Sequence, residues 1–176
     1  MIVDLRDKTI HLIPIGTKDL SFLHKVYAST RTEEMKQLPH WPEAMVEAFL
    51  KQQFEAQHEY YQNNYIGADF WIIEKNKQPI GRLYVQENFQ DTSIRIIDIA
   101  LLPEWRNKSI GSSILKDLME VSKKLNRPLT IHVESFNPAM SLYLKLGFNK
   151  IGDTNGVYHL MEWKATENYN NSAVLS

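Results

Sequence analysis

Hydrophobic residues in the first third of the chain recur at helical spacing. The first set, Leu20, Leu23, Val26 and Tyr27, predicts a helix with one apolar face. Thr17 is suited to cap this helix. A polar segment from Arg31 to Pro42 reads as a loop, and a second helix is expected over about residues 42–63, with Pro42 near its first position. A short apolar run at 10–15 predicts a strand before both helices.

Short runs of β-branched and aromatic residues predict a sheet in the rest of the chain. Strands are expected at 70–74, 80–85, 93–101, 129–133, 148–151 and 157–163. The turn Asn76–Pro79 joins the first two of these as a hairpin. A helical apolar face runs from Ile110 to Leu125, and a short helix is expected over Pro138–Leu146, closed by Gly147. This order predicts one mixed sheet with helices on both faces.

Size and composition narrow the class of protein. The 176 residues suit a single domain, which we expect over 1–164, followed by a polar and disordered tail at 165–176. The net charge of −1 gives no electrostatic reason to expect nucleic acid or a membrane as partner. Neither a signal peptide nor a membrane-spanning run is recognisable, so a cytoplasmic protein is expected. With no cysteine, disulfides and thiol nucleophiles are excluded, and no metal site is expected.

The segment from Leu101 to Ser112 (LLPEWRNKSIGS) is the most informative stretch of the chain. Pro103 stops an apolar strand, Arg106 and Lys108 lie in the following turn, and a helix starts near Gly111. The first amides of a helix lack internal partners, and the helix dipole favours an anion there. The segment therefore predicts a phosphate or diphosphate site. On the loop alone, an ordinary strand–turn–helix connection with solvated cations is an equal alternative.

A second motif, NPAMSLYLKLGF, spans residues 137–148. Read alone, it is a short helix in which Tyr143 packs into the core. Together, the two motifs resemble the Arg-x-x-Gly-x-Gly/Ala acyl-CoA loop and the Asn-x-x-Ala-x-x-Leu-Tyr-x-Lys-x-Gly-Phe signature of the GNAT N-acetyltransferase superfamily. They occur in the family's order, separated by one helix and one strand, and the resemblance covers about residues 80–163.

The resemblance implies an α/β fold with a mixed, mostly antiparallel central sheet that splays between the strands at 94–101 and 129–133. Acetyl-CoA would lie in this opening, with its pantetheine arm bonded to the strand edge and its diphosphate on the loop amides. The implied cofactor-binding residues are Ile99, Ala100, Leu101, Arg106, Asn107, Lys108, Ser109, Ile110, Gly111, Ser112 and Asn137.

The chemistry implied for this family needs a polarised thioester carbonyl, a proton for the leaving thiolate and a free amine. A strand N–H near Ala100 or Leu101 can polarise the carbonyl. The resemblance places Tyr143 beside the sulfur as general acid; a cysteine-like thiol has a pKa of about 8.5 against about 10 for tyrosine, so the transfer is uphill by only about 1.5 units. Asp98 and His132 are the candidate bases, alone or with Asp98 orienting His132. The equal alternatives are that Asp98 is a strand-end acid paired with Arg95 or a loop, and that His132 is a half-buried histidine bonded to a carbonyl. Strand alternation puts Asp98 on the face of Ile96 and Ala100.

Three positions depart from the family pattern. Ser109 stands where the first glycine is usual, and a left-handed conformation there would cost about 1–2 kcal/mol. Asn107 occupies another frequent glycine position, and asparagine tolerates left-handed geometry best among the other residues. The spacing after Asn137 is one residue shorter than in the commonest form. The loop is therefore expected to be retuned, and the role of Asn137 is less secure than that of Tyr143.

The acceptor side is expected in the first two helices and their connection. Glu33 and Glu34, with Trp41 nearby, could hold a cationic amine by charge and cation–π contact. The alternative is a solvated helix end and a packing anchor. A small-molecule amine and a peptide N-terminus both stay open as acceptor, as do a monomer and a homodimer.

The sequence thus predicts an acetyl-CoA-dependent N-acetyltransferase that transfers the acetyl group directly to a primary amine in a ternary complex. A non-catalytic acyl-CoA-binding sensor or interaction module on the same fold is the main alternative. A transferase for hydroxyl acceptors or longer acyl chains is a third possibility.

Overall fold

The computed structural model describes residues 1–38 and 40–166; most of the tail at 165–176 lies outside the described residues. Its strands are β1 (Ile10–Pro14), β2 (Asp69–Lys75), β3 (Gln78–Phe89), β4 (Ser93–Leu101), β5 (Leu129–Glu134), β6 (Asn149–Thr154) and β7 (Tyr158–Trp163). Its helices are α1 (Leu20–Thr30), α2 (Thr32–Met35), α3 (Glu43–Asn64), α4 (Ile110–Leu125) and α5 (Met140–Lys145), with short 3-10 turns at Thr17–Asp19 and Pro103–Trp105. No described helix is long and apolar enough to cross a membrane.

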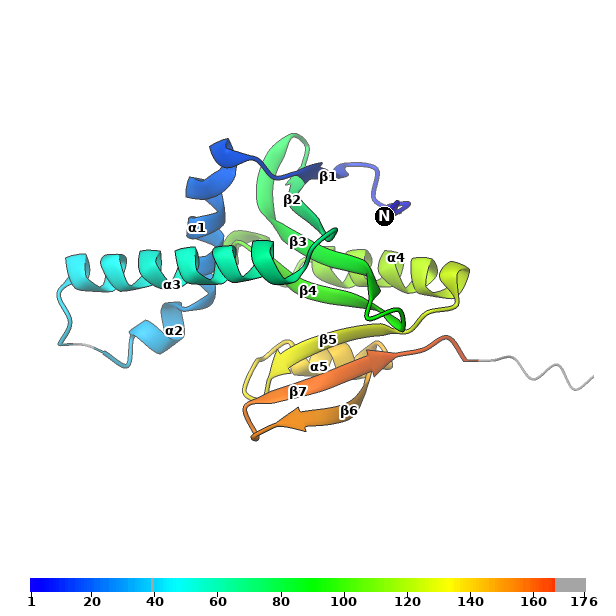
Figure 1. The fold of residues 1–176 in the computed structure, drawn as a ribbon. Helices are drawn as coiled ribbons and strands as arrows, with labels where there is room; N and C mark the ends of the chain where they lie inside the picture. The colour runs from blue at the N-terminus through cyan, green and yellow to red at the C-terminus, as the bar shows by residue number, and fades with distance from the viewer. Residues whose placement is uncertain (39, 167–176) are drawn as a thin grey trace, which may run out of the picture.

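The seven strands form one sheet in the order β1-β2-β3-β4-β5-β7-β6. All neighbours are antiparallel except β4 and β5, which are parallel and pair only from Ile94 opposite Leu129 to Ile96 opposite Ile131. Beyond these three pairs the two strands diverge (Figure 1). The splayed, mostly antiparallel sheet that the sequence predicts is thus confirmed.

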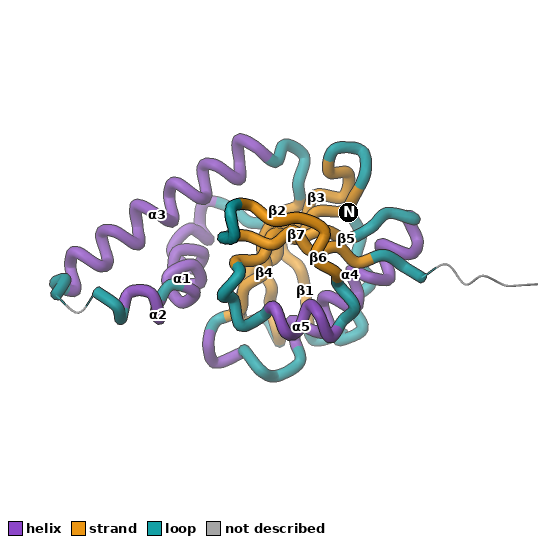
Figure 2. Tube along the Cα trace, turned by 90° about the horizontal axis from the view of Figure 1, so that it is seen from below, coloured by secondary structure: helices purple, strands orange, loops and turns teal. Residues whose placement is uncertain are grey.

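Helices cover both faces of this sheet, as predicted. The first three helices lie on one face and α4 and α5 on the other (Figure 2). On the α4 face, one core cluster joins strand residues such as Ile94 and Ile96 to the helical residues Ile114 and Leu118. A smaller cluster on the α1–α3 face contains Leu23, Phe54 and Tyr84, among others. Because α3 buries only Phe54 fully, the sheet and not this helix provides most of the core.

A β-bulge in β4 changes which residues share a face. Tyr84 of β3 lies opposite Asp98, but the next residue, Val85, lies opposite Ile96, so Ile97 is an extra residue in β4. Ile96 therefore packs on the α4 face and Ile97 on the α1–α3 face. Asp98 also lies on the α1–α3 face, since it bonds to Tyr61 of α3. The expectation that Asp98 shares a face with Ile96 is wrong because simple alternation cannot anticipate the bulge.

The connection between the first two long helices also differs from the expectation. The segment 31–42 was predicted as a loop, but Thr32–Met35 form the short helix α2. Thr32 and the two acids Glu33 and Glu34 suit a helix start, where acids favour the dipole. The hairpin turn is also shorter than predicted: only Asn76 and Lys77 adopt positive φ, and β3 begins at Gln78.

Candidate active site

The edge of β4 that faces the opening toward β5 has main-chain groups free to bind a ligand. The N–H of Leu102 donates to Ile80 of the preceding strand region at 2.8 Å. Because main-chain groups in a strand alternate in direction, Ala100 also faces β3, whereas Ile99 and Leu101 face the opening. Of the two N–H groups considered for polarising a thioester carbonyl, only that of Leu101 points to the correct side.

The loop after β4 presents a run of six main-chain amides. Among the hydrogen bonds of the described residues, none is donated by a main-chain N–H between Asn107 and Ser112; the first N–H of this region to find a partner is that of Ser113, which donates to Ser109 at 3.0 Å. Six main-chain N–H donors without a partner at the start of the 16-residue helix α4 suit a group with several anionic oxygens. The position of a diphosphate site predicted from the sequence thus has the donors that such a group requires.

Two loop residues take the left-handed conformation that the family usually assigns to glycine. Asn107 has φ 57° and Ser109 has φ 62°. Ser109 is also the N-cap of α4, but its side chain makes no capping hydrogen bond. The loop therefore keeps the required backbone shape at a cost in conformational energy.

Ser109→Gly is expected to stabilise the protein. Glycine removes a left-handed cost of about 1–2 kcal/mol, and its greater freedom in the unfolded chain offsets about 0.4–1 kcal/mol of this gain. The net rise in the free energy of unfolding is about 1 kcal/mol, or about 2–4 °C in Tm, measured by thermal unfolding without ligand. Ser112→Gly, inside the helix where φ is negative, is the matched control and should lower stability by about 0.5–1 kcal/mol. A Tm that Ser109→Gly leaves unchanged or lowers would contradict the inference that the left-handed conformation of Ser109 is strained.

The two cations of the loop are held by the protein itself. Arg106 donates from Nε to the carbonyl of Leu101 at 2.9 Å and from Nη2 to the Ser29 hydroxyl at 3.1 Å. It therefore ties the loop to the end of β4 and to α1. Lys108 lies with its Nζ 5.5 Å from the ring centroid of Trp105. Arg106 thus holds the loop in place, and its contact with an anion stays a prediction.

Asn137 begins the turn that leads into α5. Its Oδ1 accepts a hydrogen bond from the N–H of Ala139 at 2.9 Å, and its carbonyl accepts from the N–H of Met140 at 3.0 Å. These bonds organise the start of the short helix. The predicted contact of Asn137 with pantetheine would have to use its amide Nδ2.

Tyr143 is a core residue of α5 whose ring packs edge-on against Phe148, with 5.5 Å between centroids. Only 5% of the residue is exposed. Burial, and then the negative charge of Asp98, raise the pKa of Tyr143 well above its usual range. Because Tyr143 belongs to the cluster on the α4 face and Asp98 lies on the α1–α3 face, the two act from opposite faces of the sheet. The phenol therefore stays protonated at neutral pH, and its transfer of a proton to a thiolate is more uphill than the ordinary pKa of tyrosine implies.

Asp98 is engaged by a buried arginine. Arg82 of β3 donates from Nη2 to Oδ2 at 2.8 Å and from Nε to Oδ1 at 3.3 Å. Tyr61 donates to the same Oδ2 at 3.4 Å, and Arg82 also donates to Gln57 of α3 at 2.8 Å. With Arg82 only 2% exposed, this carboxylate neutralises a buried charge. It keeps lone pairs for a further hydrogen bond, but it is not a free base.

His132 is the first residue of β5 beyond the stretch paired with β4. Its Nδ1 lies 3.4 Å from Nη1 of Arg95, a buried residue that also donates to Thr130 at 2.9 Å. A guanidinium can only donate, so Nδ1 must be the acceptor and the neutral ring carries its proton on Nε2. Burial, and then the charge of Arg95, lower the pKa of His132. The ring therefore presents an N–H, not a lone pair, on its outer side.

The predicted acceptor residues separate in the structure. Glu34 bonds to Arg31 at 2.9 Å, and the same Nη1 of Arg31 bonds to Glu134 at the end of β5 at 3.1 Å. Glu33 instead pairs with Lys36 in solvent, and Trp41 packs edge-on against Phe49 of α3. Glu34 thus lies beside the ion pair that joins Arg31 to Glu134 of β5, whereas Glu33 takes no part in it.

Three arginines organise this side. Arg82, Arg95 and Arg31 hold Asp98, His132 and Glu134, respectively. A signal existed for the first: Arg82 interrupts an otherwise apolar strand, and an arginine that becomes buried requires a partner. The partner of Arg95 depends on strand register, which the sequence does not show.

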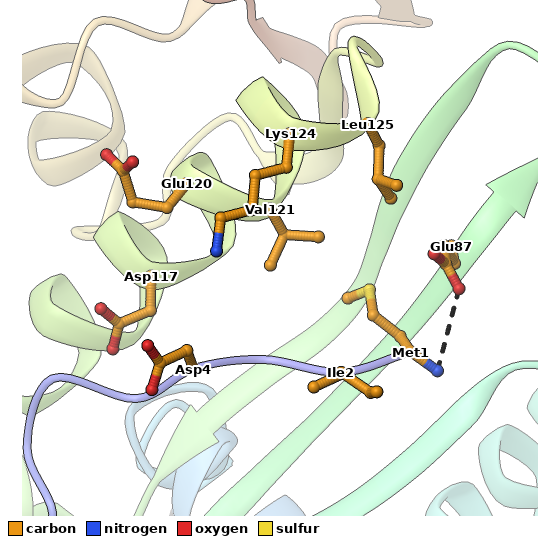
Figure 3. A pocket seen from close by; sticks show the side chains of 9 residues that line it. All are labelled: Met1, Ile2, Asp4, Glu87, Asp117, Glu120, Val121, Lys124 and Leu125. Carbon is orange, nitrogen blue, oxygen red and sulfur yellow. Dashed lines mark ion pairs between the residues drawn. The ribbon is translucent and has the colours of Figure 1, made fainter.

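A cavity lies apart from the predicted site residues. It measures about 440 Å³ and is lined by the first residues of the chain, Glu87 and the second half of α4 (Figure 3). Its buried carboxylate, Asp117, forms an ion pair with Arg6 at 3.1 Å. It contains none of the predicted site residues. A smaller cavity of about 230 Å³ lies among α1, α2 and α3 and is lined by Tyr27, Arg31 and Glu34, among others.

Comparisons with known proteins agree with the fold and the motifs. The model of the family described as "Acetyltransferase (GNAT) domain" matches residues 67–150. A protein of Bacillus subtilis (strain 168), named for a proposed activity as a ribosomal protein bS18 alanine N-acetyltransferase, is 29% identical over 140 residues, which cover 76% of this chain and 89% of that protein.

Two solved structures show the same fold. The paia N-acetyltransferase of Thermoplasma acidophilum, in complex with coenzyme A, has 20% identity and a TM-score of 0.63 over 89% of this chain and 99% of that one. Naa50 of Arabidopsis thaliana, in complex with the bisubstrate analogue CoA-Ac-MVNAL, has 17% identity and a TM-score of 0.58 over the same shares of the two chains. These matches, the two sequence motifs and the splayed sheet identify a GNAT acetyltransferase domain in this chain, matched by the family model over residues 67–150.

Proposed function

We propose that the protein transfers the acetyl group of acetyl-CoA directly to a primary amine that is bound at the same time. The main observation in support of this proposal is the run of main-chain N–H groups from Asn107 to Ser112 that have no hydrogen-bond partner, beside the open edge of β4. A diphosphate and an amide-containing arm are the parts of coenzyme A that such donors and such an edge would bind. The fold neighbour crystallised with coenzyme A supports the same cofactor.

Each part of the site has a role in this proposal. The loop amides hold the diphosphate, and the main-chain groups of Ile99 pair with the pantetheine arm like an added strand. The N–H of Leu101 polarises the thioester carbonyl. Tyr143 donates its proton to the thiolate as the amine nitrogen bonds to the acetyl carbon and the carbon–sulfur bond breaks. Asp98, through a water molecule, is the proposed acceptor of the amine proton.

Direct transfer is favoured over an acyl-enzyme because the chain has no cysteine. The amine and the thioester must then meet in the opening between β4 and β5. Direct transfer predicts intersecting lines in double-reciprocal plots, whereas an acyl-enzyme would give the parallel lines of ping-pong kinetics.

Cofactor binding is tested by thermal unfolding with coenzyme A and with acetyl-CoA. A ligand at 100 times its Kd should stabilise the protein by about 2.7 kcal/mol, which is about 5–11 °C in Tm for a chain of this size. Gly111→Asp, which places a carboxylate among the loop amides, should abolish the shift, whereas Gly67→Asp, in an exposed turn, should retain it. A wild-type protein that neither ligand shifts would refute the proposal.

The second candidate is a module that binds acyl-CoA without catalysis. The specific observation in its favour is that Arg82 occupies both oxygens of Asp98 and Arg95 occupies Nδ1 of His132. Release of coenzyme A thiol in the presence of an amine panel distinguishes the two candidates. A protein that shifts in Tm with acetyl-CoA but releases no thiol with any amine is the module.

A further inference from the structure

The acceptor side of the opening is richer in hydrogen-bond donors than in available negative charge. Glu34 and Glu134 share the guanidinium of Arg31, and Asp98 is paired with Arg82. These pairs are partly or largely buried, since the side chains of Arg31 and Glu134 are only 25% and 21% exposed. A substrate with several cationic amines would have to displace arginine from each carboxylate.

His132 is the hydrogen-bond donor that we consider next to the Arg31–Glu134 and Arg82–Asp98 ion pairs. It lies on the same face of β5 as Thr130, held by Arg95, and Glu134, held by Arg31. It is the first β5 residue past the point where β4 departs, and its side chain is exposed. Since Arg95 donates to Nδ1, the Nε2–H of the ring is free to donate to a ligand oxygen.

We propose that Arg95 fixes His132 as a hydrogen-bond donor for a carbonyl oxygen of the acceptor, so that the site selects an amine adjacent to a carbonyl: the α-amine of a peptide or of an amino acid amide. This rests on the proposed function and specifies its acceptor. A carbonyl two atoms from the amine nitrogen satisfies the donor, whereas an alkyl diamine leaves it unpaired. His132 is thereby a binding residue and not the general base.

Asp98, which is paired with Arg82, is a weak base, and an α-amine is an acceptor that needs only a weak base. At pH 7 an α-amine with a pKa of about 7.7–8.0 is roughly 10–15% free base, whereas an alkyl amine with a pKa of about 10.4 is free base to only a few parts in ten thousand. The α-amine thus has an advantage of roughly 200- to 400-fold before any contact with the protein. A carboxylate that is bound by Arg82 can serve such an acceptor, because little deprotonation is required of it.

The acceptor class is tested by steady-state release of coenzyme A at pH 7 with four matched amines. These are an alanyl tripeptide amide, alaninamide, the same tripeptide blocked at its N-terminus and carrying one lysine, and 1,4-diaminobutane. We expect kcat/KM for the tripeptide to exceed that for the blocked peptide and the diamine by at least about 100-fold. Alaninamide distinguishes an amino acid amide from a peptide as the acceptor. If its kcat/KM equals that of the tripeptide, the α-amine and the adjacent carbonyl suffice; if its kcat/KM is lower, the site also binds further peptide residues. A preference for the diamine or the lysine would overturn the proposal. The absence of thiol release with every one of these amines would instead refute the proposed function.

The role of His132 is tested with two substitutions and two readouts. His132→Gln retains an N–H donor, and His132→Leu removes it. We expect His132→Leu to raise KM for the tripeptide at least tenfold with a smaller change in kcat, to leave a simple alkyl amine unaffected, and to be rescued by the Gln variant. A base would instead lose kcat with every amine in both variants, which would overturn the proposal. Imidazole 15N shifts at pH 7.5 should show the Nε2–H tautomer; a proton on Nδ1 would equally overturn it.

Discussion

Tyr143→Phe is expected to lower the turnover number by a factor of about 10²–10⁴, the usual contribution of a positioned general acid. The substitution removes only the hydroxyl and leaves the ring packed against Phe148. The affinity for acetyl-CoA, measured by thermal shift, should therefore stay within about twofold of the wild type. Steady-state thiol release at saturating substrates measures the effect.

The pH dependence of turnover gives an independent check on Tyr143. Burial and the charge of Asp98 raise its pKa, so the protonated phenol persists through alkaline solution and Tyr143 contributes no loss of rate between pH 7 and 9. Tyr60→Phe, on an exposed position of α3, is the matched control and should retain full activity. Full turnover in Tyr143→Phe would remove the assigned acid.

Asp98→Ala is expected to lower the free energy of unfolding by about 3–5 kcal/mol, because it leaves the buried guanidinium of Arg82 without a counter-charge. In a chain of this size the loss corresponds to a decrease in Tm of about 6–20 °C. Thermal unfolding measures it. Asp98 therefore affects stability as well as any proton transfer, and rate data for its variants must be compared at a temperature where each is folded.

Two further variants separate charge burial from simple loss of contacts. Glu33→Gln breaks an exposed pair with Lys36 and should change stability by no more than about 0.5 kcal/mol. The double variant Asp98→Leu with Arg82→Met removes both charges and should recover most of the loss. An Asp98→Ala variant that unfolds within 1 °C of the wild type would show that Arg82 is satisfied by its hydrogen bond to Gln57 and by the Tyr84 ring, whose centroid lies 5.0 Å from its Cζ.

Local patterns predicted most of the fold, because each long element had a clear period. The apolar face of α4, with Ile114 and Leu118, and the strands of the sheet follow directly from spacing. The splayed sheet followed from the resemblance carried by the two motifs, and the cofactor position that the same resemblance implies stays a prediction. Helix α2 was missed because a four-residue helix has too few turns to show a period.

The acceptor side could be predicted least, since its character depends on contacts between distant residues. The pairing of Arg31 with Glu134 spans 103 residues, and that of Arg95 with His132 spans 37. Such contacts depend on strand register and on the bulge at Ile97, neither of which has a signal in hydrophobic spacing. Hydrophobic spacing therefore could not show that Asp98 and His132 each contact an arginine.

The extra residue in β4 links two parts of the molecule. The main-chain N–H of Ile94 donates to Pro128 before β5, but that of Leu102 donates to Ile80 of β3, so the strand reverses its orientation once along its length. If β4 kept Ile97 but paired with β3 in continuous alternation, the part of the strand after Ile97 would be rotated by one step, so that Ile99 and Leu101 would face β3 and Asp98 would move away from Arg82. The open strand edge and the neutralisation of a buried charge therefore depend on the same extra residue.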